Sequence, residues 1–330
     1  MNNIFDWQYY LDNNLDLRPN GVQSKEQAML HWNTYGKHEN RTVRFFESIS
    51  INNTLCVSGE RIQEIAEVYL GLCDDFSYNP YISNQTDKHK NLLEITSIYN
   101  NPRIVFCYTH RIDILSDKIQ FFNNNFILIT HNSDKNITYN DRYVERIYNC
   151  NKLIKWYTQN LCIEHHKISF LPIGIANNQW EHGSMFMNFY NNYKNTNNIK
   201  IKHIYFLFDM STNIEKRKQC YDSIINKVPF LNKIQPYDNY NRLSEYEFCI
   251  CPEGNGIDTH RFWEALYLKC IPIVIKNPLT EIIHKSTNLP MILLNTWDEL
   301  DVNTLPVYTS FDFVNCSHYL DINFYKIMIQ

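Results

Sequence analysis

The sequence predicts an α/β protein whose two halves each contain a parallel β-sheet covered by helices. Short apolar runs typical of buried strands alternate with stretches of helical length and amphipathic spacing along most of the chain. A polar, Asn-rich segment at 181–199 interrupts this alternation. The length of 330 residues also exceeds what one hydrophobic core usually serves, so two domains are expected.

Residues 1–48 are expected to form a small helical segment ahead of the α/β body. Phe5, Trp7 and Tyr10 have the spacing of an amphipathic helix, and a second set of apolar residues follows at 28–35. The segment is too short for a large core of its own. We therefore expect it to pack on the body or on a protein partner.

The first α/β half is expected over residues 49–180. Strands are predicted at 54–59, 103–110, 126–134, 152–160 and 167–175, and helices at 61–72, 111–122 and 141–149. Strands that alternate with helices of this length favour a parallel sheet with helices on both faces.

The segment 181–199 is expected to be a linker with irregular helix, and the second half follows over 200–330. Strands are predicted at 201–210, 246–251, 271–275 and 291–297, and helices at 211–227, from 261, at 277–285 and near 298–305. Both halves are thus predicted to be Rossmann-like.

The charge and composition of the chain indicate which kinds of partner and which location to expect. The formal net charge is −4 and long Lys/Arg runs are absent, which argues against nucleic acid or an anionic membrane as a partner. No stretch approaches the length of a transmembrane helix. The first residues lack the pattern of a signal peptide, and the ten cysteines are scattered through apolar runs. We expect a cytoplasmic protein with reduced cysteines.

The most informative stretch is 246–275, which has the order strand, Gly-containing turn, helix, strand. The predicted helix begins with His260 and Arg261, and Glu264 follows one turn later. Backbone N–H groups at a helix start favour phosphate, and a cation with a carboxylate on one face suits a diphosphate and a ribose hydroxyl. This pattern indicates a nucleotide-sugar site. An ordinary βαβ unit with surface charges has the same spacing.

Ligands of open parallel sheets bind at the carboxyl ends of the strands, so polar residues that follow the strands are candidates. Thr212 and Asn213 follow the strand at 201–210, and Arg217 lies one to two turns into the next helix. Arg217 could point back at the same crevice. It could equally be a solvated charge among its charged neighbours.

The turn after the strand at 246–251 supplies four more candidates. Asn255 and Gly256 suit a turn that lets the backbone approach a ligand. Asp258 or Thr259 is expected to cap the following helix, and either residue could bind a hydroxyl as well.

Three patterns typical of other nucleotide sites are missing. The chain has neither a G-x-x-x-x-G-K-[ST] loop nor a G-x-G-x-x-G motif after its first predicted strand. It also lacks a D-x-D sequence that would hold a diphosphate through a metal ion. Arg261, Arg217 and helix dipoles are therefore expected to neutralise the diphosphate without a metal.

In the first half, two strands end in similar clusters. Residues 109–111 read Thr-His-Arg with Asp113 nearby, and residues 130–134 run from Thr through His131 to Asp134. A histidine with a carboxylate at such a position suits general-base catalysis. Polar strand ends also cap helices and hold loops, so both readings stay open.

Several blocks together resemble exostosin-like glycosyltransferases. The stretch FCICPEGNGIDTHRFWEALYLKCIPIV resembles their donor-site signature. The blocks THNSD, KWYTQN, LPIGIANNQWEHG and FLFDMSTNIEKRKQC resemble the branch found in large DNA viruses and some bacteria. The resemblance covers roughly residues 100–300, and the N-terminal YLDNNLDL and AMLHWNTYGKHENR resemble a short helical module attached to some such enzymes.

The resemblance implies a GT-B architecture, in which two Rossmann-like domains face a cleft. The second domain would bind a UDP- or GDP-sugar, and the first would bind the acceptor, a glycan or glycoprotein hydroxyl. Carried over by position, Arg261 and Arg217 would bind the diphosphate, Glu264 the ribose, and residues 255–260 the donor. His260 departs from the small residue usual there, and Lys269 replaces a glycine.

An inverting enzyme of this kind needs a base, for which Asp134, His131 and Asp113 are the candidates in that order. A retaining enzyme needs none. If the chain is viral, its expected location is the host cytoplasm. Two alternatives remain: a non-catalytic nucleotide- or carbohydrate-binding protein of this fold, and a glycosyltransferase that acts on modified DNA bases.

Overall fold

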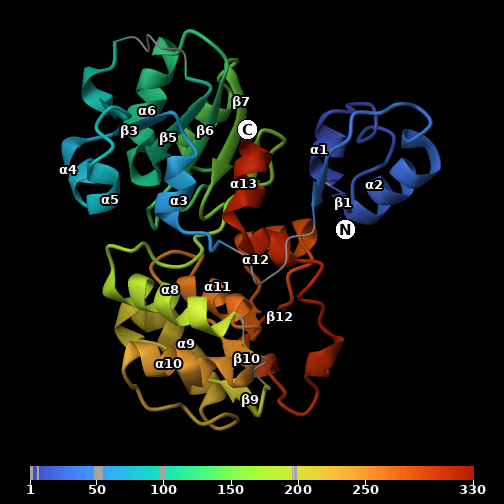
Figure 1. Ribbon diagram of the computed structural model, residues 1–330, viewed down its shortest axis with the longest axis vertical. Helices are drawn as coiled ribbons and strands as arrows, with labels where there is room; N and C mark the ends of the chain where they lie inside the picture. The colour runs from blue at the N-terminus through green and yellow to red at the C-terminus, as the bar shows by residue number, and fades with distance from the viewer. Residues whose placement is uncertain (1–2, 6, 48–54, 97–101, 195, 197–198) are drawn as a thin grey trace.

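The computed structural model contains two parallel β-sheets, one of six strands and one of four, that lie one above the other in Figure 1. It describes residues 3–5, 7–47, 55–96, 102–194, 196 and 199–330. The prediction of a mixed α/β chain with two parallel sheets is confirmed. None of the helices in these ranges is long and apolar enough to cross a membrane.

The six-stranded sheet has the order β4-β3-β5-β6-β7-β8. Its strands are β3 Val68–Gly71, β4 His89–Asn91, β5 Ile104–Tyr108, β6 Phe126–His131, β7 Leu153–Thr158 and β8 Ile168–Phe170. Every residue of β5 and β6 is buried, as expected for central strands covered on both faces. In the parallel register Tyr108 lies opposite His131, so both strands end at the same edge of the sheet.

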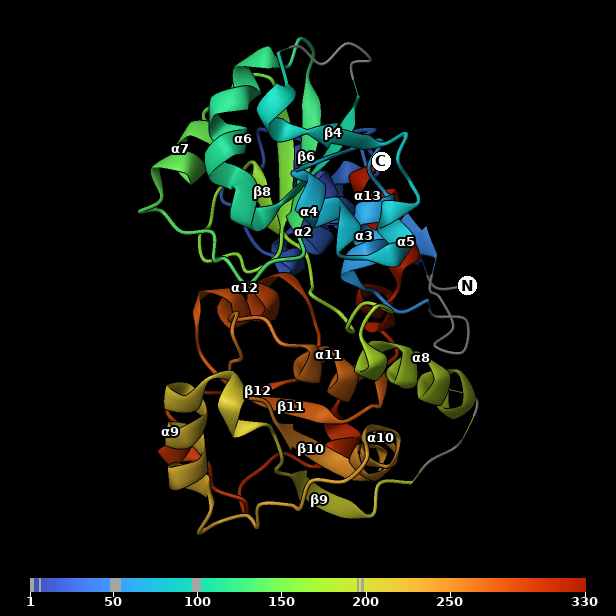
Figure 2. The same ribbon diagram turned by 90° about the vertical axis from the view of Figure 1, so that its left-hand side faces the viewer.

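Helices cover both faces of this sheet. The covering helices are α3 Gly59–Glu64, α4 Cys73–Ser77, α5 Pro80–Ser83, α6 Ile112–Lys118 and α7 Arg142–Tyr148. In Figure 2, α6 and α7 lie on one side of the sheet and α3 lies on the other.

The four-stranded sheet has the order β12-β11-β10-β9, also fully parallel. Its strands are β9 Lys202–Tyr205, β10 Tyr246–Ile250, β11 Ile271–Ile275 and β12 Ile292–Leu294. Its helices are α9 Ile214–Ile224, α10 Pro236–Ser244, α11 His260–Tyr267 and α12 Pro278–Ser286. The β10–α11–β11 unit thus forms where the apolar runs and the intervening helical stretch predict it.

The N-terminal segment forms a small unit to one side of the body (Figure 1). It contains β1 Asn3–Phe5, α1 Trp7–Asp12, α2 Lys25–His31, a π-helical turn Trp32–Gly36 and β2 Phe45–Glu47. The sequence predicted its helices but not the antiparallel pairing of β1 with β2. An ion pair of 3.3 Å between Lys155 and Asp12, and a hydrogen bond from Arg44 to the Ile327 carbonyl, tie it to the body.

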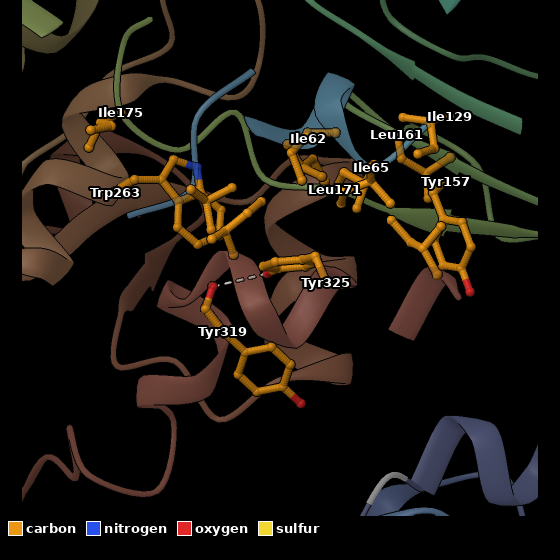
Figure 3. Close-up of a cluster of buried hydrophobic side chains, with 14 of the residues drawn as sticks. Ile62, Ile65, Ile129, Tyr157, Leu161, Leu171, Ile175, Trp263, Tyr319 and Tyr325 are labelled. Atoms are coloured by element: carbon orange, nitrogen blue, oxygen red, sulfur yellow. Dashed lines mark hydrogen bonds between the residues drawn. The ribbon is translucent and has the colours of Figure 1, made fainter. Parts of the chain in front are cut away.

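The two α/β halves share one hydrophobic core. Trp263 of α11, Ile62 of α3 and Tyr325 of α13 (Ile322–Ile329) belong to the same buried cluster, which Figure 3 draws. Although α13 lies at the end of the second half in sequence, it packs on the first half, where the Tyr157 hydroxyl donates to the Met328 carbonyl at 3.2 Å. Domains that share a large apolar interface move little relative to each other, so we expect this side of the body to be rigid.

Three predicted elements differ. The described residues of 54–59 form only a bridge between Ser58 and Ile175 before α3 begins. The helix predicted at 61–72 ends at Glu64, and the rest of the stretch becomes β3, since residues 68–70 pair with β5. At 298–305 only a 3-10 turn, Trp297–Glu299, forms in place of a helix.

The segment 181–199 contains a regular helix, α8, Glu181–Tyr193. Its buried residues Phe186, Phe189, Tyr190 and Tyr193 recur at helical spacing and pack against the second half. The many asparagines around them concealed this apolar stripe in the sequence. Helix α10 was also not predicted.

Candidate functional site

The carboxyl ends of the two sheets meet. Asn160, directly after β7, accepts a hydrogen bond from the Asp258 N–H through its Oδ1 at 3.0 Å. His260 at the start of α11 contacts the Gly174 carbonyl through Nδ1 at 2.8 Å. Since ligands of open parallel sheets bind at these ends, the residues around this junction form the candidate site.

Two arginines from different helices converge at the end of β9. Arg261 of α11 donates from Nη1 to the Leu207 carbonyl at 3.2 Å. Arg217 of α9 donates from Nε to the Glu253 carbonyl at 3.1 Å and from Nη1 to the Asp209 carbonyl. The structure thus brings together two candidates that the sequence could not show to be neighbours.

These arginines leave positive charge at the site. Arg217 is 9% exposed, and within the described ranges its hydrogen bonds go to carbonyl groups rather than to a carboxylate. Burial and the guanidinium of Arg261 both lower the pKa of Arg217. A bound anion would relieve both effects, because it stabilises the charged form and screens the repulsion.

Glu264 forms an ion pair with Arg261 of the same helix. Its carboxylate is buried and accepts a hydrogen bond from Arg261 Nε at 3.0 Å through Oε2. This pairing orients the Arg261 side chain on the face of α11. A ribose contact by Glu264 remains a prediction, and it would have to coexist with this ion pair.

The loop between β10 and α11 holds three of the candidates in different environments. Asn255 is exposed, whereas Gly256 is buried against Asn160. A Cβ at Gly256 would lie 2.9 Å from the Asn160 amide nitrogen, so a larger residue here would force the Asn160 side chain to shift. Thr259 occupies the N-cap position of α11, but its side chain makes no capping hydrogen bond. The first turn of α11 therefore has no side-chain cap.

The candidates after β9 face this loop. Asn213 donates from Nδ2 to the Gly254 carbonyl at 2.7 Å and caps α9 by accepting from the Lys216 N–H. Thr212 is exposed beside it. Asn213 therefore fixes the position of the loop, and a ligand contact by Thr212 stays a prediction.

Asp258 is buried at the junction of the halves. It accepts hydrogen bonds from the Ile173 N–H at 2.7 Å and from Trp263 Nε1 at 2.8 Å. Burial raises the pKa of Asp258 to about 7, although both hydrogen bonds act in the opposite direction. The residue predicted as a cap or hydroxyl ligand thus mainly joins the β10–α11 loop to the first half.

A cavity of about 90 Å³ opens at the ends of β10, β11 and β12. Thr259, Phe262, Asn277, Thr296 and Trp297 line it. It lies over β10–β12, whereas the arginine pair lies over β9. The sequence analysis missed Asn277 and Thr296, although both follow strands and the rule that polar strand ends line the crevice could have found them.

The three candidate bases occupy different environments. Asp134 is exposed at the edge of the six-stranded sheet, and its charge raises the pKa of His260, which burial lowers more strongly. Asp113 lies in the first turn of α6, and no described residue hydrogen-bonds to its buried Oδ1. The two carboxylates are therefore not equivalent in exposure.

His131 is buried and its two ring nitrogens are both occupied. Nε2 lies 3.0 Å from the Pro172 carbonyl and Nδ1 lies 3.2 Å from Asn132 Oδ1. Burial lowers the pKa of His131 to about 4. This geometry favours a role in holding the 171–174 loop over one in proton transfer.

No protein-family model matches this chain, and no curated protein matches it significantly. Among the described residues, no group of three or more His, Cys, Asp or Glu side chains is arranged to hold a metal ion. The fold and the site define a class, a mixed α/β protein with two parallel sheets and a pair of arginines at the carboxyl end of β9.

Proposed function

We propose that the protein is a metal-independent, exostosin-like glycosyltransferase of GT-B architecture that uses a nucleotide sugar as donor. The observation that carries this proposal is the pair Arg217 and Arg261 at the carboxyl end of β9, beside the start of α11. Two guanidinium groups with planar sets of N–H donors suit the adjacent phosphates of a nucleoside diphosphate.

The surroundings of the arginine pair support a diphosphate as the ligand. The first turn of α11 contributes N–H groups that no side chain caps, together with the positive end of its dipole. Thr212 and Asn255 are exposed on the two adjoining segments and offer a hydroxyl and an amide. These groups would bind a diphosphate without a metal ion.

The cavity over β10–β12 provides room for a further part of the donor. Its volume of about 90 Å³ is well below that of a typical ligand pocket, so it would take only one portion, which we assign to the nucleobase. Phe262 and Trp297 supply apolar walls, and Asn277 and Thr296 supply polar groups for base edges. The donor would then span the loop from Glu253 to Thr259.

In the reaction that we propose, a glycan or glycoprotein hydroxyl bound by the first half attacks the anomeric carbon of the sugar. The bond from that carbon to the diphosphate breaks, and the electron pair leaves with the nucleoside diphosphate. Arg217 and Arg261 stabilise the charge that develops on the leaving oxygen. This is electrostatic stabilisation by groups already oriented in the protein.

The test compares Arg217→Gln with Lys218→Gln. Both changes remove one cation from α9, but Lys218 is exposed and forms its ion pair with Asp222, which is also exposed. Loss of charge-assisted bonds to phosphate should cost about 1.5–3 kcal/mol of binding, or roughly 10- to 150-fold in affinity. Thermal shift with UDP- and GDP-sugars, followed by calorimetry on the donor that binds, measures the effect.

Equal donor affinity in both variants would remove the arginine assignment. Failure of every sugar nucleotide and nucleoside diphosphate to stabilise the wild-type protein would refute the donor site altogether. Tight donor binding without transfer to any saccharide acceptor would favour the non-catalytic binding protein instead.

A further inference from the structure

A histidine and a buried carboxylate form a pair at the edge of the six-stranded sheet. His110 lies in the 3-10 turn Thr109–Arg111 after β5, and Asp75 lies in α4 after β3. Because β3 and β5 are neighbours in the sheet, their carboxyl ends bring the two side chains together. His110 Nε2 lies 2.8 Å from Asp75 Oδ1.

The carboxylate of Asp75 is fixed in place. Its side chain is 6% exposed, and it accepts hydrogen bonds from the Leu72 N–H at 2.7 Å and from Arg111 Nε at 2.9 Å. Burial alone would raise the pKa of Asp75, but the hydrogen bonds from His110 and Arg111 hold it well below its ordinary value. Asp75 is therefore an ionised acceptor that holds the imidazole in one orientation.

The other side of the imidazole is open. The His110 side chain is 40% exposed, and no described residue hydrogen-bonds to its Nδ1. With Nε2–H donating to Asp75, Nδ1 carries the lone pair. An imidazole oriented by a buried carboxylate, with its second nitrogen accessible, is the arrangement of a general base.

We propose that His110 is the catalytic base of the transfer reaction and that Asp75 is its positioning residue. This inference rests on the proposed glycosyltransferase function. The acceptor O–H bond breaks and its proton goes to His110 Nδ1, while the oxygen forms the new bond to the anomeric carbon. The bond from that carbon to the diphosphate breaks on the opposite side, so the configuration of the sugar inverts.

His110 meets the requirements of a base better than the residues that the sequence favoured. His131 lies at the end of the neighbouring strand, but it is buried and both of its nitrogens are occupied. Asp134 is exposed, yet no described residue orients its carboxylate. His110 alone among these combines accessibility with an orienting partner.

The helix that holds Asp75 also presents an aromatic surface for a saccharide. Tyr78 at the C-terminal end of α4 lies 5.6 Å, centroid to centroid, from Trp180, which precedes α8. Both side chains are exposed. Exposed aromatic faces beside a base suit the apolar face of a sugar ring, which makes a saccharide the acceptor.

The experiment compares His110→Gln and Asp75→Asn with His284→Gln, a change at an exposed histidine of α12. Donor affinity by calorimetry should be unchanged in all three variants. The rate of transfer to saccharide acceptors should fall at least 100-fold in His110→Gln, the usual contribution of a general base. In Asp75→Asn the fall should be in kcat with both KM values retained, and the wild-type product should have inverted anomeric configuration.

If His110→Gln transfers sugar at the wild-type rate, or if the product has retained configuration, the proposed base is wrong. The proposed function would still stand in either case as long as the donor binds. Loss of donor binding in wild type and variants alike would instead refute the proposed function. If Asp75→Asn does not fold, His110→Gln decides the matter, because His110 is exposed and the Leu72 N–H and Arg111 still hold the Asp75 carboxylate after its replacement.

Discussion

Replacement of Asp258 by asparagine tests how the β10–α11 loop is joined to the first half. Asp258 is buried, and its two carboxylate oxygens accept from Ile173 N–H and Trp263 Nε1–H. Asparagine has one acceptor oxygen and an amide that only donates. One of the two N–H groups therefore loses its acceptor, which costs about 1–3 kcal/mol of the free energy of unfolding.

The pH dependence of the free energy of unfolding allows a more precise prediction. Burial raises the pKa of Asp258 from 3.8 to about 7, so between these values the folded protein binds a proton that the unfolded chain has released. Stability must then fall as pH rises through this window, by about 1.4 kcal/mol for each pH unit and about 4 kcal/mol in total. The asparagine side chain does not titrate, so the stability of the variant does not fall in this way.

Urea unfolding of wild type and Asp258→Asn at pH 5 and pH 8 measures the difference. The variant should gain about 3 kcal/mol relative to wild type between these two pH values. Comparison of the two proteins cancels the titration of every other group. If the free energies of unfolding of wild type and variant differ by the same amount at pH 5 and pH 8, within about 0.5 kcal/mol, the inference that a buried carboxyl of raised pKa joins the halves is refuted.

Two further predictions concern stability. Burial lowers the pKa of His131 from 6.5 to about 4, so the unfolded chain binds a proton before the folded protein does as pH falls. Between pH 6.5 and pH 4 the free energy of unfolding of wild type should therefore fall by about 3 kcal/mol relative to that of His131→Gln. Urea unfolding that shows the same pH dependence for both proteins would contradict this prediction. Gly174 has a φ of +65° and its added Cβ would lie 2.1 Å from the Val57 carbonyl, whereas Gly21 has a φ of +90° and open space. Gly174→Ala should cost about 2–5 kcal/mol and Gly21→Ala about 1 kcal/mol, and equal shifts in denaturation midpoint would count against the steric argument.

Much of the fold could be predicted because its signals are local. The strand at β10, the helix at α11 and the strand at β11 form near the expected residues. Their apolar runs and the turn between them are contiguous in sequence. The helix predicted over 61–72 was wrong in its second part because a distant contact decides the structure there. The stretch has helical spacing, but pairing of residues 68–70 with β5 makes that part a strand.

The candidate site was predicted in part. Thr212, Asn213 and the 255–261 stretch were candidates because they are polar and follow predicted strands. Ligands of open parallel sheets bind at the carboxyl ends of the strands, so this rule needs only the positions of the strands. The pairing of Asp75 with His110 was not predicted, since nothing in sequence links α4 to the turn after β5. Sheet order alone makes them neighbours.

The sequence by itself determined the class of this protein: two parallel sheets follow from apolar runs separated by amphipathic helices, and each of those patterns is set by neighbouring residues. Only the tertiary structure decided which charged groups act together. Arg217 and Arg261 converge on β9, and His131 becomes a buried structural residue while His110 stays open to solvent. Burial and the approach of distant strands decide these outcomes, and both arise only when the chain packs.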